Sequence, residues 1–251
     1  MKKSIINFGI LVASITILCG FDSASEEENR SSNIEDYQLI DASEIPSGKY
    51  SDTEVALEGV IDNHTAGSDN CSFTLWIKSG DTYLYDDGFF YGIEEGSPEE
   101  IFQNAKDGDI VHFATKIYDD NSFGPTTVYA AEIVGSADLI SVYDSYKASC
   151  SQIDYDGASR NPDQYEGSKC FVSGTIFQVV NEGSSSAEYI VETADGLVYL
   201  NWYENEDTRG SRFLEGDSAN IYGQYDGLET YDSLVKENTI PRVIVNLIEL
   251  I

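Results

Sequence analysis

The chain contains the same pattern of residues twice, and this repeat limits its fold more than any other feature of the sequence. Residues 41–61 align without a gap with residues 156–176, at an offset of 115. Residues 108–113 then match residues 216–221 at an offset of 108. Such self-similarity predicts two copies of one structural unit, the second with a shorter middle and a longer late loop. The matched pairs include Tyr50 with Tyr165, Gly59 with Gly174, Ile61 with Ile176 and Ile133 with Ile248.

Each copy is predicted to be mainly β. Residues 54–61 alternate between polar and apolar side chains, which is typical of a strand with one buried face. Ser97, Pro98 and Glu100 predict a short helix, with Ser97 as its cap and Glu100 completing a capping box. Residues 226–239 are predicted to form a long loop. The predicted strands are 54–61, 72–78, 82–90, 109–118 and 126–134 in the first copy, and 169–180, 188–193, 198–203, 218–225 and 241–250 in the second, where residues 204–210 replace the helix.

Five strands with a helix between the third and the fourth is the order of an OB-fold barrel. The second copy also carries Asn161-Pro162, Glu215-Gly216-Asp217 and Tyr222-Gly223, followed by a strand that begins at Pro241. In these motifs it resembles the small OB modules of exported proteins from Gram-positive bacteria, and distantly the C-terminal module of the clostridial toxin-operon negative regulator. The resemblance is good over residues 156–251 and faint over the first copy. It implies a fold and a location, and it assigns no functional residue.

We therefore expect an all-β chain with minor helix, made of two tandem five-stranded OB-like barrels after a signal peptide and an acidic linker. Apolar residues make up 41% of the chain, which is enough for a packed core. The chain has 45 acidic and 14 basic side chains, with a net charge of −31. Phosphate contacts need clustered Lys and Arg, so this charge argues against a nucleic-acid partner and against adsorption to anionic lipid.

The first residues have the form of an export signal. Met1-Lys2-Lys3 precedes an apolar run that is shorter than a bilayer span. The run resembles a bacterial lipoprotein signal in which Cys19 becomes the lipidated N-terminus, although Leu18 stands where a small residue is usual. Cleavage near Ser25 and a retained membrane anchor are the alternatives. The predicted organisation is a signal peptide at 1–19, a disordered linker at 20–38, a first OB-like domain at 39–135, a connecting helix at 136–150 and a second OB-like domain at 151–251.

The sequence offers little for covalent or metal chemistry. Cys150 and Cys170 could form a disulfide in an exported chain, whereas Cys170 also lies on an apolar face where a thiol would serve as a small hydrophobe. No CxxC motif or Cys/His cluster predicts zinc, and the acidic pairs follow no calcium-loop spacing. No nucleophile motif is present, and His64 and His112 are predicted to lie on the surface. We expect no cofactor, no metal and no enzymatic activity.

Aromatic side chains are the candidate binding groups. OB barrels bind ligands on the face of their second and third strands. Rings exposed there could stack on a sugar or a peptide, and the alternative is that they fill the barrel. The candidate ligand-binding residues are Tyr83 and Tyr85 in the first copy, Tyr199, Trp202 and Tyr203 in the second, and Tyr231 in the late loop.

Together these features predict a non-enzymatic extracytoplasmic lipoprotein that binds an envelope protein, a peptide or a glycan. It would lie on the outer face of the cytoplasmic membrane or be secreted, contact the membrane through its N-terminal lipid alone, and bind no nucleic acid. The alternative, implied by the toxin-operon resemblance, is a membrane-anchored regulatory protein that contacts single-stranded nucleic acid or a sigma factor.

Overall fold

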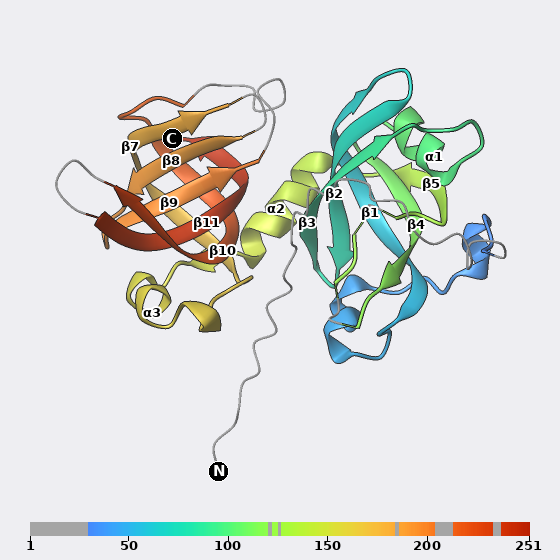
Figure 1. The fold of residues 1–251 in the computed structure, drawn as a ribbon, viewed down its shortest axis with the longest axis horizontal. Coiled ribbons are helices and arrows are strands. Elements are labelled where there is room, and N and C mark those ends of the chain that lie inside the picture. The colour runs from blue at the N-terminus through green and yellow to red at the C-terminus, as the bar shows by residue number, and fades with distance from the viewer. Residues whose placement is uncertain (1–29, 120–121, 125–126, 184–185, 204–212, 233–236) are drawn as a thin grey trace, which may run out of the picture. The chain divides into compact units, whose positions relative to one another are not determined.

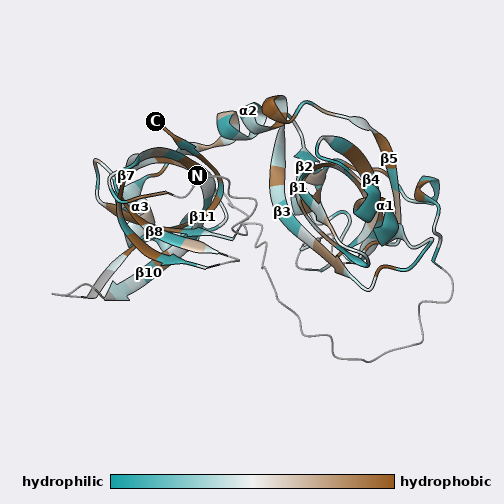
Figure 2. Cartoon of the chain, turned by 90° about the horizontal axis from the view of Figure 1, so that it is seen from above, coloured by the Kyte–Doolittle hydropathy of each residue, from teal (hydrophilic) through white to brown (hydrophobic). Residues whose placement is uncertain are grey.

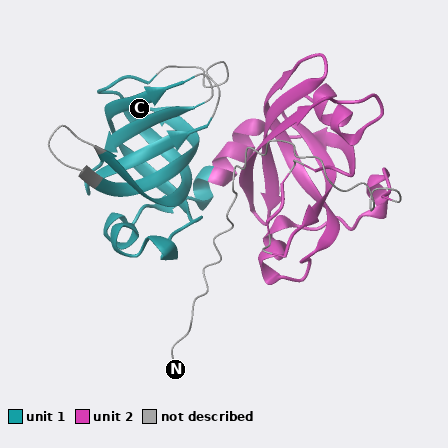
Figure 3. Ribbon diagram, in the orientation of Figure 1, with its two compact units in different colours: residues 1–9, 147–251 teal, residues 10–146 magenta. Residues whose placement is uncertain are grey.

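The computed structural model describes residues 30–119, 122–124, 127–183, 186–203, 213–232 and 237–251. The predicted signal segment, Cys19 and most of the acidic linker lie outside these residues. Contacts within the chain divide it into two compact units, which Figure 3 draws in different colours. We call residues 30–146 the N-terminal unit and residues 147–251 the C-terminal unit. Within the part of the chain that the structure describes, no helix is both long and apolar enough to cross a membrane.

The N-terminal unit is built on an antiparallel five-stranded sheet with the order β3-β2-β1-β4-β5 (Figure 1). Helix α1 (Pro98–Asn104) lies between β3 and β4 in the sequence and buries Phe102 in the core. Two short helical turns, η2 (Ile34–Asp36) and η3 (Ala42–Ser47), precede the first strand. The strands are β1 (Thr53–Ala66), β2 (Asn70–Ser79), β3 (Thr82–Tyr91), β4 (Asp109–Ile117) and β5 (Ala130–Ser136).

The C-terminal unit is a closed barrel, and Figure 2 looks along its ring of strands. The order is β10-β11-β9-β8-β7, β10 closes the ring by pairing with β7, and β11 runs parallel to β9. Strand β6 (Ser151–Gln152) is added beside β7. The barrel strands are β7 (Lys169–Glu182), β8 (Ala187–Glu192), β9 (Leu197–Trp202), β10 (Ser218–Asp232) and β11 (Glu237–Leu250). The predicted class, two tandem OB-like units with minor helix, is confirmed.

The two units share the strand registers that the repeat predicts. Gly59 of β1 pairs with Val111 of β4, and Gly174 of β7 pairs with Ala219 of β10, which reproduces the offsets of 115 and 108. Both glycines allow close packing. A Cβ at Gly59 would lie 2.6 Å from Leu75 Cδ1, and a Cβ at Gly174 would lie 2.3 Å from a main-chain carbonyl oxygen.

The turn before the fourth strand is also repeated. Gly108 has a φ of +89° and donates its N–H to the Ile61 carbonyl, while Gly216 has a φ of +96° and donates to the Ile176 carbonyl. Because only glycine adopts this left-handed backbone without strain, both copies keep it at the same place. The following aspartates accept a main-chain N–H three residues upstream, at 2.8 Å in both units.

The predicted match of the last strands was wrong by two residues. Val111 pairs with Ile133, and its counterpart Ala219 pairs with Leu250, so Ile133 corresponds to Leu250 and not to Ile248. A bulge in each of these strand pairs shifts the pairing of residues across the strands. An alignment of the two sequences does not show where such bulges occur.

The predicted late loop was also wrong. Residues 226–232 continue β10 and residues 237–240 begin β11, and the two segments pair as an extended hairpin, which we call the β10–β11 arm. Pro241 therefore lies inside β11 rather than at its start. It pairs with Leu228 directly after a bulge, where the sheet tolerates a residue that lacks an N–H donor.

The remaining helices follow the prediction with one local difference. Helix α2 (Leu139–Ser149) occupies the predicted connection, and α3 (Tyr155–Arg160) with η4 (Pro162–Gln164) precedes β7. In α1, Ser97 is the N-cap residue, but its hydroxyl makes no capping hydrogen bond. Glu100 instead accepts the N–H of Gly96 at 2.7 Å, so the predicted capping box is replaced by a contact one residue earlier.

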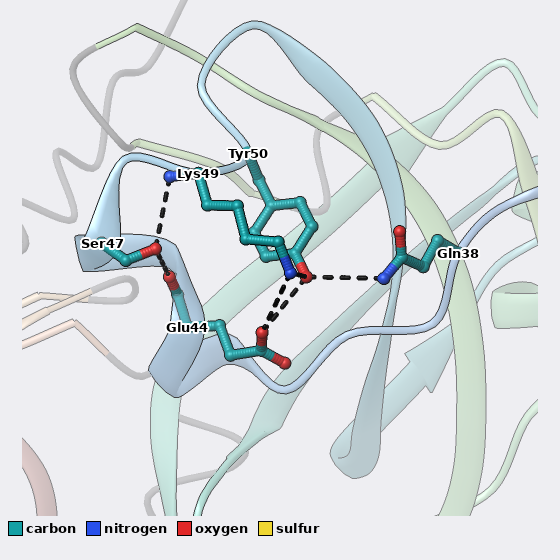
Figure 4. Close-up of polar contacts among 5 residues, drawn as sticks. All are labelled: Gln38, Glu44, Ser47, Lys49 and Tyr50. Atoms are coloured by element: carbon teal, nitrogen blue, oxygen red, sulfur yellow. Dashed lines mark hydrogen bonds and ion pairs between the residues drawn. The ribbon is translucent and has the colours of Figure 1, made fainter.

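In each unit a tyrosine ties the segment before the first strand to the preceding helical turn. The Tyr50 hydroxyl donates to Glu44 at 3.1 Å and accepts from Lys49 Nζ at 2.6 Å and from Gln38 Nε2 at 3.4 Å (Figure 4). The Tyr165 hydroxyl donates to Asp154 at 2.7 Å. Tyr50 and Tyr165, which the repeat aligns with each other, therefore make the same kind of hydrogen bond to a carboxylate in their units.

Candidate functional site

The candidate site lies on the outer face of β2 and β3 in the N-terminal unit. Phe73, Leu75 and Ile77 of β2 pack into the core, so the residues between them face outward. Leu84 and Phe90 of β3 also pack on the core. The outer face of β3 therefore presents a row of five side chains, which we call the β3 row: Tyr83, Tyr85, Asp87, Phe89 and Tyr91.

One end of the β3 row is covered by helix α2, which lies beside β3 in Figures 1 and 2. Trp76, opposite Tyr85, is 1% exposed. Its ring meets Tyr85 edge to face at 5.1 Å between centroids. On its other side it meets Tyr143 at 5.7 Å and Tyr146 at 5.1 Å, both from α2. These rings form an aromatic cluster outside the core of the sheet, in which Trp76, Tyr85 and Tyr146 are buried and Tyr143 is half-buried.

A buried carboxylate fixes α2 over this cluster. Asp62 of β1 accepts a hydrogen bond from Trp76 Nε1 at 3.0 Å and one from the Tyr143 hydroxyl at 2.6 Å. It also accepts the N–H of Asn63 at 2.8 Å. A buried carboxylate is costly unless its oxygens are satisfied, and three donors satisfy this one. Asp62 therefore serves as the polar contact between the sheet and the helix.

The other end of the β3 row is open to solvent. Phe89 is 60% exposed and Tyr91 is 78% exposed. Asp87 beside them is exposed and accepts a hydrogen bond from Thr74 at 3.2 Å. Among the described residues, the structure gives neither Phe89 nor Tyr91 a ring or cation partner. Two neighbouring exposed rings on a sheet surface are the kind of patch that marks an interaction site.

Cations on this unit lie over tyrosine rings. Residues 30–146 contain 23 acidic and five basic side chains. Four of the five cations approach a tyrosine ring centroid to within 6 Å, which is the range of a cation–π interaction. One of them, Lys78, lies 5.1 Å over Tyr83 at the start of the β3 row. The other three cation–ring pairs lie elsewhere in the unit, so Tyr83 is the ring of the β3 row that one of these cations covers.

Asp86 points to the opposite side of β3, into the unit. It pairs with Leu75 and follows Leu84, both of which belong to the core packing. Burial raises the pKa of Asp86 to about 7, and the negative charge of Asp87 raises it further. The N–H of Asp87 donates to Asp86 at 2.9 Å and partly offsets this effect. Asp86 is therefore a carboxyl that changes its charge near neutral pH.

The equivalent outer face of the C-terminal unit is covered by the β10–β11 arm. Tyr199 of β9 and Ile190 of β8 form a small apolar cluster with Ile240 of the arm, and Tyr231 of the arm packs against it. Burial raises the pKa of Tyr199 to about 12, with Glu188 as the next contribution. At the base of the arm, Arg242 forms ion pairs with Asp226 at 2.6 Å and with Glu229 at 2.8 Å.

The structure separates the predicted ligand-binding residues. Tyr83 is half-buried at one end of the β3 row, whereas Tyr85 is buried under α2. Tyr199 is buried and Tyr231 helps to cover it. Trp202 points into the barrel, where its ring lies 5.4 Å from Phe213. Tyr203 is 46% exposed. The exposed pair Phe89 and Tyr91 was missing from the candidates, although both follow Tyr83 and Tyr85 at even spacing in one strand, which places all four on the same face.

The other candidate groups have structural surroundings. Cys71, Cys150 and Cys170 carry thiols rather than disulfides in the structure, so a bond between Cys150 and Cys170 stays a prediction. His64 Nε2 lies 2.9 Å from the Phe102 carbonyl oxygen, and His112 lies 3.3 Å from Glu58. Across the described ranges, no group of three or more His, Cys, Asp or Glu residues is arranged to hold a metal ion.

Comparison with known proteins gives distant structural likenesses. No protein-family model and no curated protein matches the chain. A murine DNA-binding protein bound to double-stranded DNA is 11% identical, with a TM-score of 0.34 over 78% of this chain and 95% of that one. The p204 HINb domain is 8% identical, with a TM-score of 0.36 over 77% and 95%. A replication protein A heterotrimer bound to single-stranded DNA is 9% identical, with a TM-score of 0.25 over 86% and 69%.

These structures contradict two of the predictions made from the sequence. We expected an extracytoplasmic protein that binds an envelope protein, a peptide or a glycan, and we expected no nucleic-acid partner. The similar structures include complexes with double-stranded and single-stranded DNA, and both expectations are withdrawn. The reasoning was wrong because net charge describes the whole chain, whereas contacts with bases and phosphates depend on a local surface. Likenesses of this size assign no ligand to the present chain.

Proposed function

We propose that this chain is a non-enzymatic regulatory binding protein that engages a basic protein, of the kind that itself handles nucleic acid. The observation that carries the proposal is the open end of the β3 row. There, Phe89 and Tyr91 are exposed side by side, next to the exposed residue Asp87, whose carboxylate accepts a hydrogen bond from Thr74. Exposed rings flanked by carboxylates complement Lys and Arg side chains, because each ring face and each carboxylate attracts a cation.

The charge of the unit supports this choice of partner. Its 23 acidic and five basic side chains produce a negative field that attracts a cationic protein over a distance of about a Debye length. Beyond Tyr91 the chain continues through the exposed residues Glu94 and Glu95, which extend the acidic border of the patch. The contact of Lys78 with Tyr83 provides an example, within the same row, of the interaction that the partner would make.

A direct test measures the binding of a fluorescently labelled peptide rich in Lys and Arg to the purified full-length chain by anisotropy, at low and high salt. We expect binding that weakens as salt rises. The double substitution F89A/Y91A should weaken it by about tenfold, because exposed aromatic anchors of this kind carry much of the binding energy of a contact surface. Phe177→Ala is the matched control, since Phe177 is 54% exposed on β7 of the other unit. Equal effects of the two variants, or no binding at low salt, would refute the proposal.

Single-stranded nucleic acid is a second candidate partner. Phe89 and Tyr91 lie on the third strand of an OB-like unit, where exposed rings of other OB folds stack on bases. An unstructured thymidine oligonucleotide in the same anisotropy assay separates the two candidates. Tighter binding of the oligonucleotide than of the basic peptide, lost in F89A/Y91A, would favour this second function.

Lipid attachment at Cys19 and membrane anchoring stay predictions. Mass spectrometry of the mature N-terminus tests both, because a diacylglyceryl group on Cys19 and a cleavage near Ser25 give different masses.

A further inference from the structure

We propose that α2 is a strap that covers one end of the β3 row, and that a basic partner and α2 compete for this face of the N-terminal unit. This inference rests on the proposed function and adds a means of regulation to it. The β3 row is one continuous surface of alternating side chains, yet its two ends differ sharply in exposure. Tyr85 is 8% exposed under α2, and Tyr91, six residues further along the strand, is 78% exposed.

The contacts of α2 resemble those that a bound ligand would make. Tyr143 and Tyr146 place their rings against Trp76 at 5.7 and 5.1 Å, and the Tyr143 hydroxyl bonds to the Asp62 carboxylate. A partner that brought a guanidinium or ammonium group to this face would find the same two features, ring faces and a carboxylate. The strap thus occupies positions that are chemically suited to the partner proposed above.

Polar contacts hold the strap at its middle and in its last turn, where Lys147 forms an ion pair with Glu249 at 3.0 Å and Ser149 accepts a hydrogen bond from Lys169 at 3.2 Å. The hydrogen bond from Tyr143 to Asp62 is 2.6 Å long, while the contact from the Thr82 hydroxyl to the Ser145 carbonyl is 3.5 Å long. Val142 and Tyr146 of the strap are buried and add apolar packing against the sheet. Displacing α2 would extend the exposed surface from Phe89 and Tyr91 of the β3 row to Tyr85 of the same row and to its neighbour Trp76 of β2.

One experiment loosens the strap. Trp202→Phe leaves Trp76 as the single tryptophan of the chain, so that acrylamide quenching reports the exposure of this ring. In that background, Tyr143→Phe removes the bond to Asp62 and keeps the ring. We expect the quenching constant of Trp76 to rise about twofold and the affinity for the basic peptide to rise about threefold. Tyr118→Phe is the matched control, because its 45% exposed ring lies in the same unit outside the β3 row.

A second experiment locks the strap. Thr82→Cys combined with Ser145→Cys places two thiols where β3 meets α2, and oxidation by a soluble disulfide would join them, with release of the reduced reagent. The oxidised chain should bind the peptide at least fivefold more weakly than the same chain after reduction. Wild-type chain under both conditions controls for its own cysteines. Unchanged binding on locking, with F89A/Y91A still effective, would overturn the strap and leave the proposed function intact. A wild-type chain that binds no peptide would overturn both.

Discussion

Asp86 offers a quantitative test of the structure, because its carboxyl faces the packed interior of the N-terminal unit. Its pKa rises from 3.8 to about 7 as the chain folds. At about 1.36 kcal/mol per pKa unit, this difference corresponds to an upper limit of about 4 kcal/mol. Asp86 keeps partial contact with solvent. We therefore expect about half of that value, about 2 kcal/mol, as the cost of its charge in the folded state.

The sign of the pH dependence follows from which state binds the proton more tightly. Between pH 4 and 7 the folded chain keeps Asp86 protonated, whereas the unfolded chain releases that proton. The free energy of unfolding should therefore fall as pH rises through this window, and the contribution of Asp86 should be constant above it. Asp86→Asn removes the titration, so the variant should be about 2 kcal/mol more stable than wild type at pH 8 and equal to it at pH 4.

The assay is urea unfolding at pH 4 to 8, followed by the emission of Trp76 in a Trp202→Phe background, so that the signal reports the N-terminal unit. Asp81→Asn is the control for a general loss of negative charge, because Asp81 lies exposed in the turn between β2 and β3 of the same unit. It should change stability by less than about 0.5 kcal/mol. Parallel stability profiles for wild type and Asp86→Asn across the whole range would refute the reasoning.

Four further substitutions test the packing of the repeat and the arm. Gly174→Ala should cost about 2–3 kcal/mol by urea unfolding, because the new Cβ would meet a main-chain oxygen at 2.3 Å. Gly59→Ala should cost about 1 kcal/mol, because its Cβ would meet the end of the Leu75 side chain, which can shift more easily than main chain. Tyr225→Phe removes a 2.9 Å hydrogen bond from a buried hydroxyl to a carbonyl oxygen and should cost about 1 kcal/mol in the same assay. Arg242→Met breaks two ion pairs and should speed hydrogen exchange in the β10–β11 arm by about fivefold, with unchanged exchange in β7.

The features that the sequence predicts correctly are those that depend on residues close together in the chain. The left-handed turns at Gly108 and Gly216 and the close packing at Gly59 and Gly174 require glycine for steric reasons. Such positions recur in both copies and reveal the repeat. The order of strands and the position of the helix then indicate the OB-like architecture.

The features that could not be predicted from the sequence depend on which element covers the outer face of each sheet. Alternation correctly places Tyr85 and Tyr199 on outer faces, yet no local pattern states that α2 would cover one and the arm the other. The prediction of Trp202 as a ligand-binding residue failed for a different reason. The alternation along β9 that turns Tyr199 outward also turns Trp202 into the barrel. The length of the arm was missed because Leu228 and Tyr231 look like loop residues until they pair across to β11.

The two units cover the same face of the same fold with unrelated elements, and this contrast supports the proposed binding surface. An exposed apolar face costs about 25 cal/mol for each Å² left in water, so covering it stabilises each unit. The C-terminal unit uses a hairpin continuous with its own barrel, with an ion-paired base at Arg242. The N-terminal unit uses a separate helix that stops short of Phe89 and Tyr91. Because the chain covers this face elsewhere, the two exposed rings at the uncovered end support the proposal that a partner binds there.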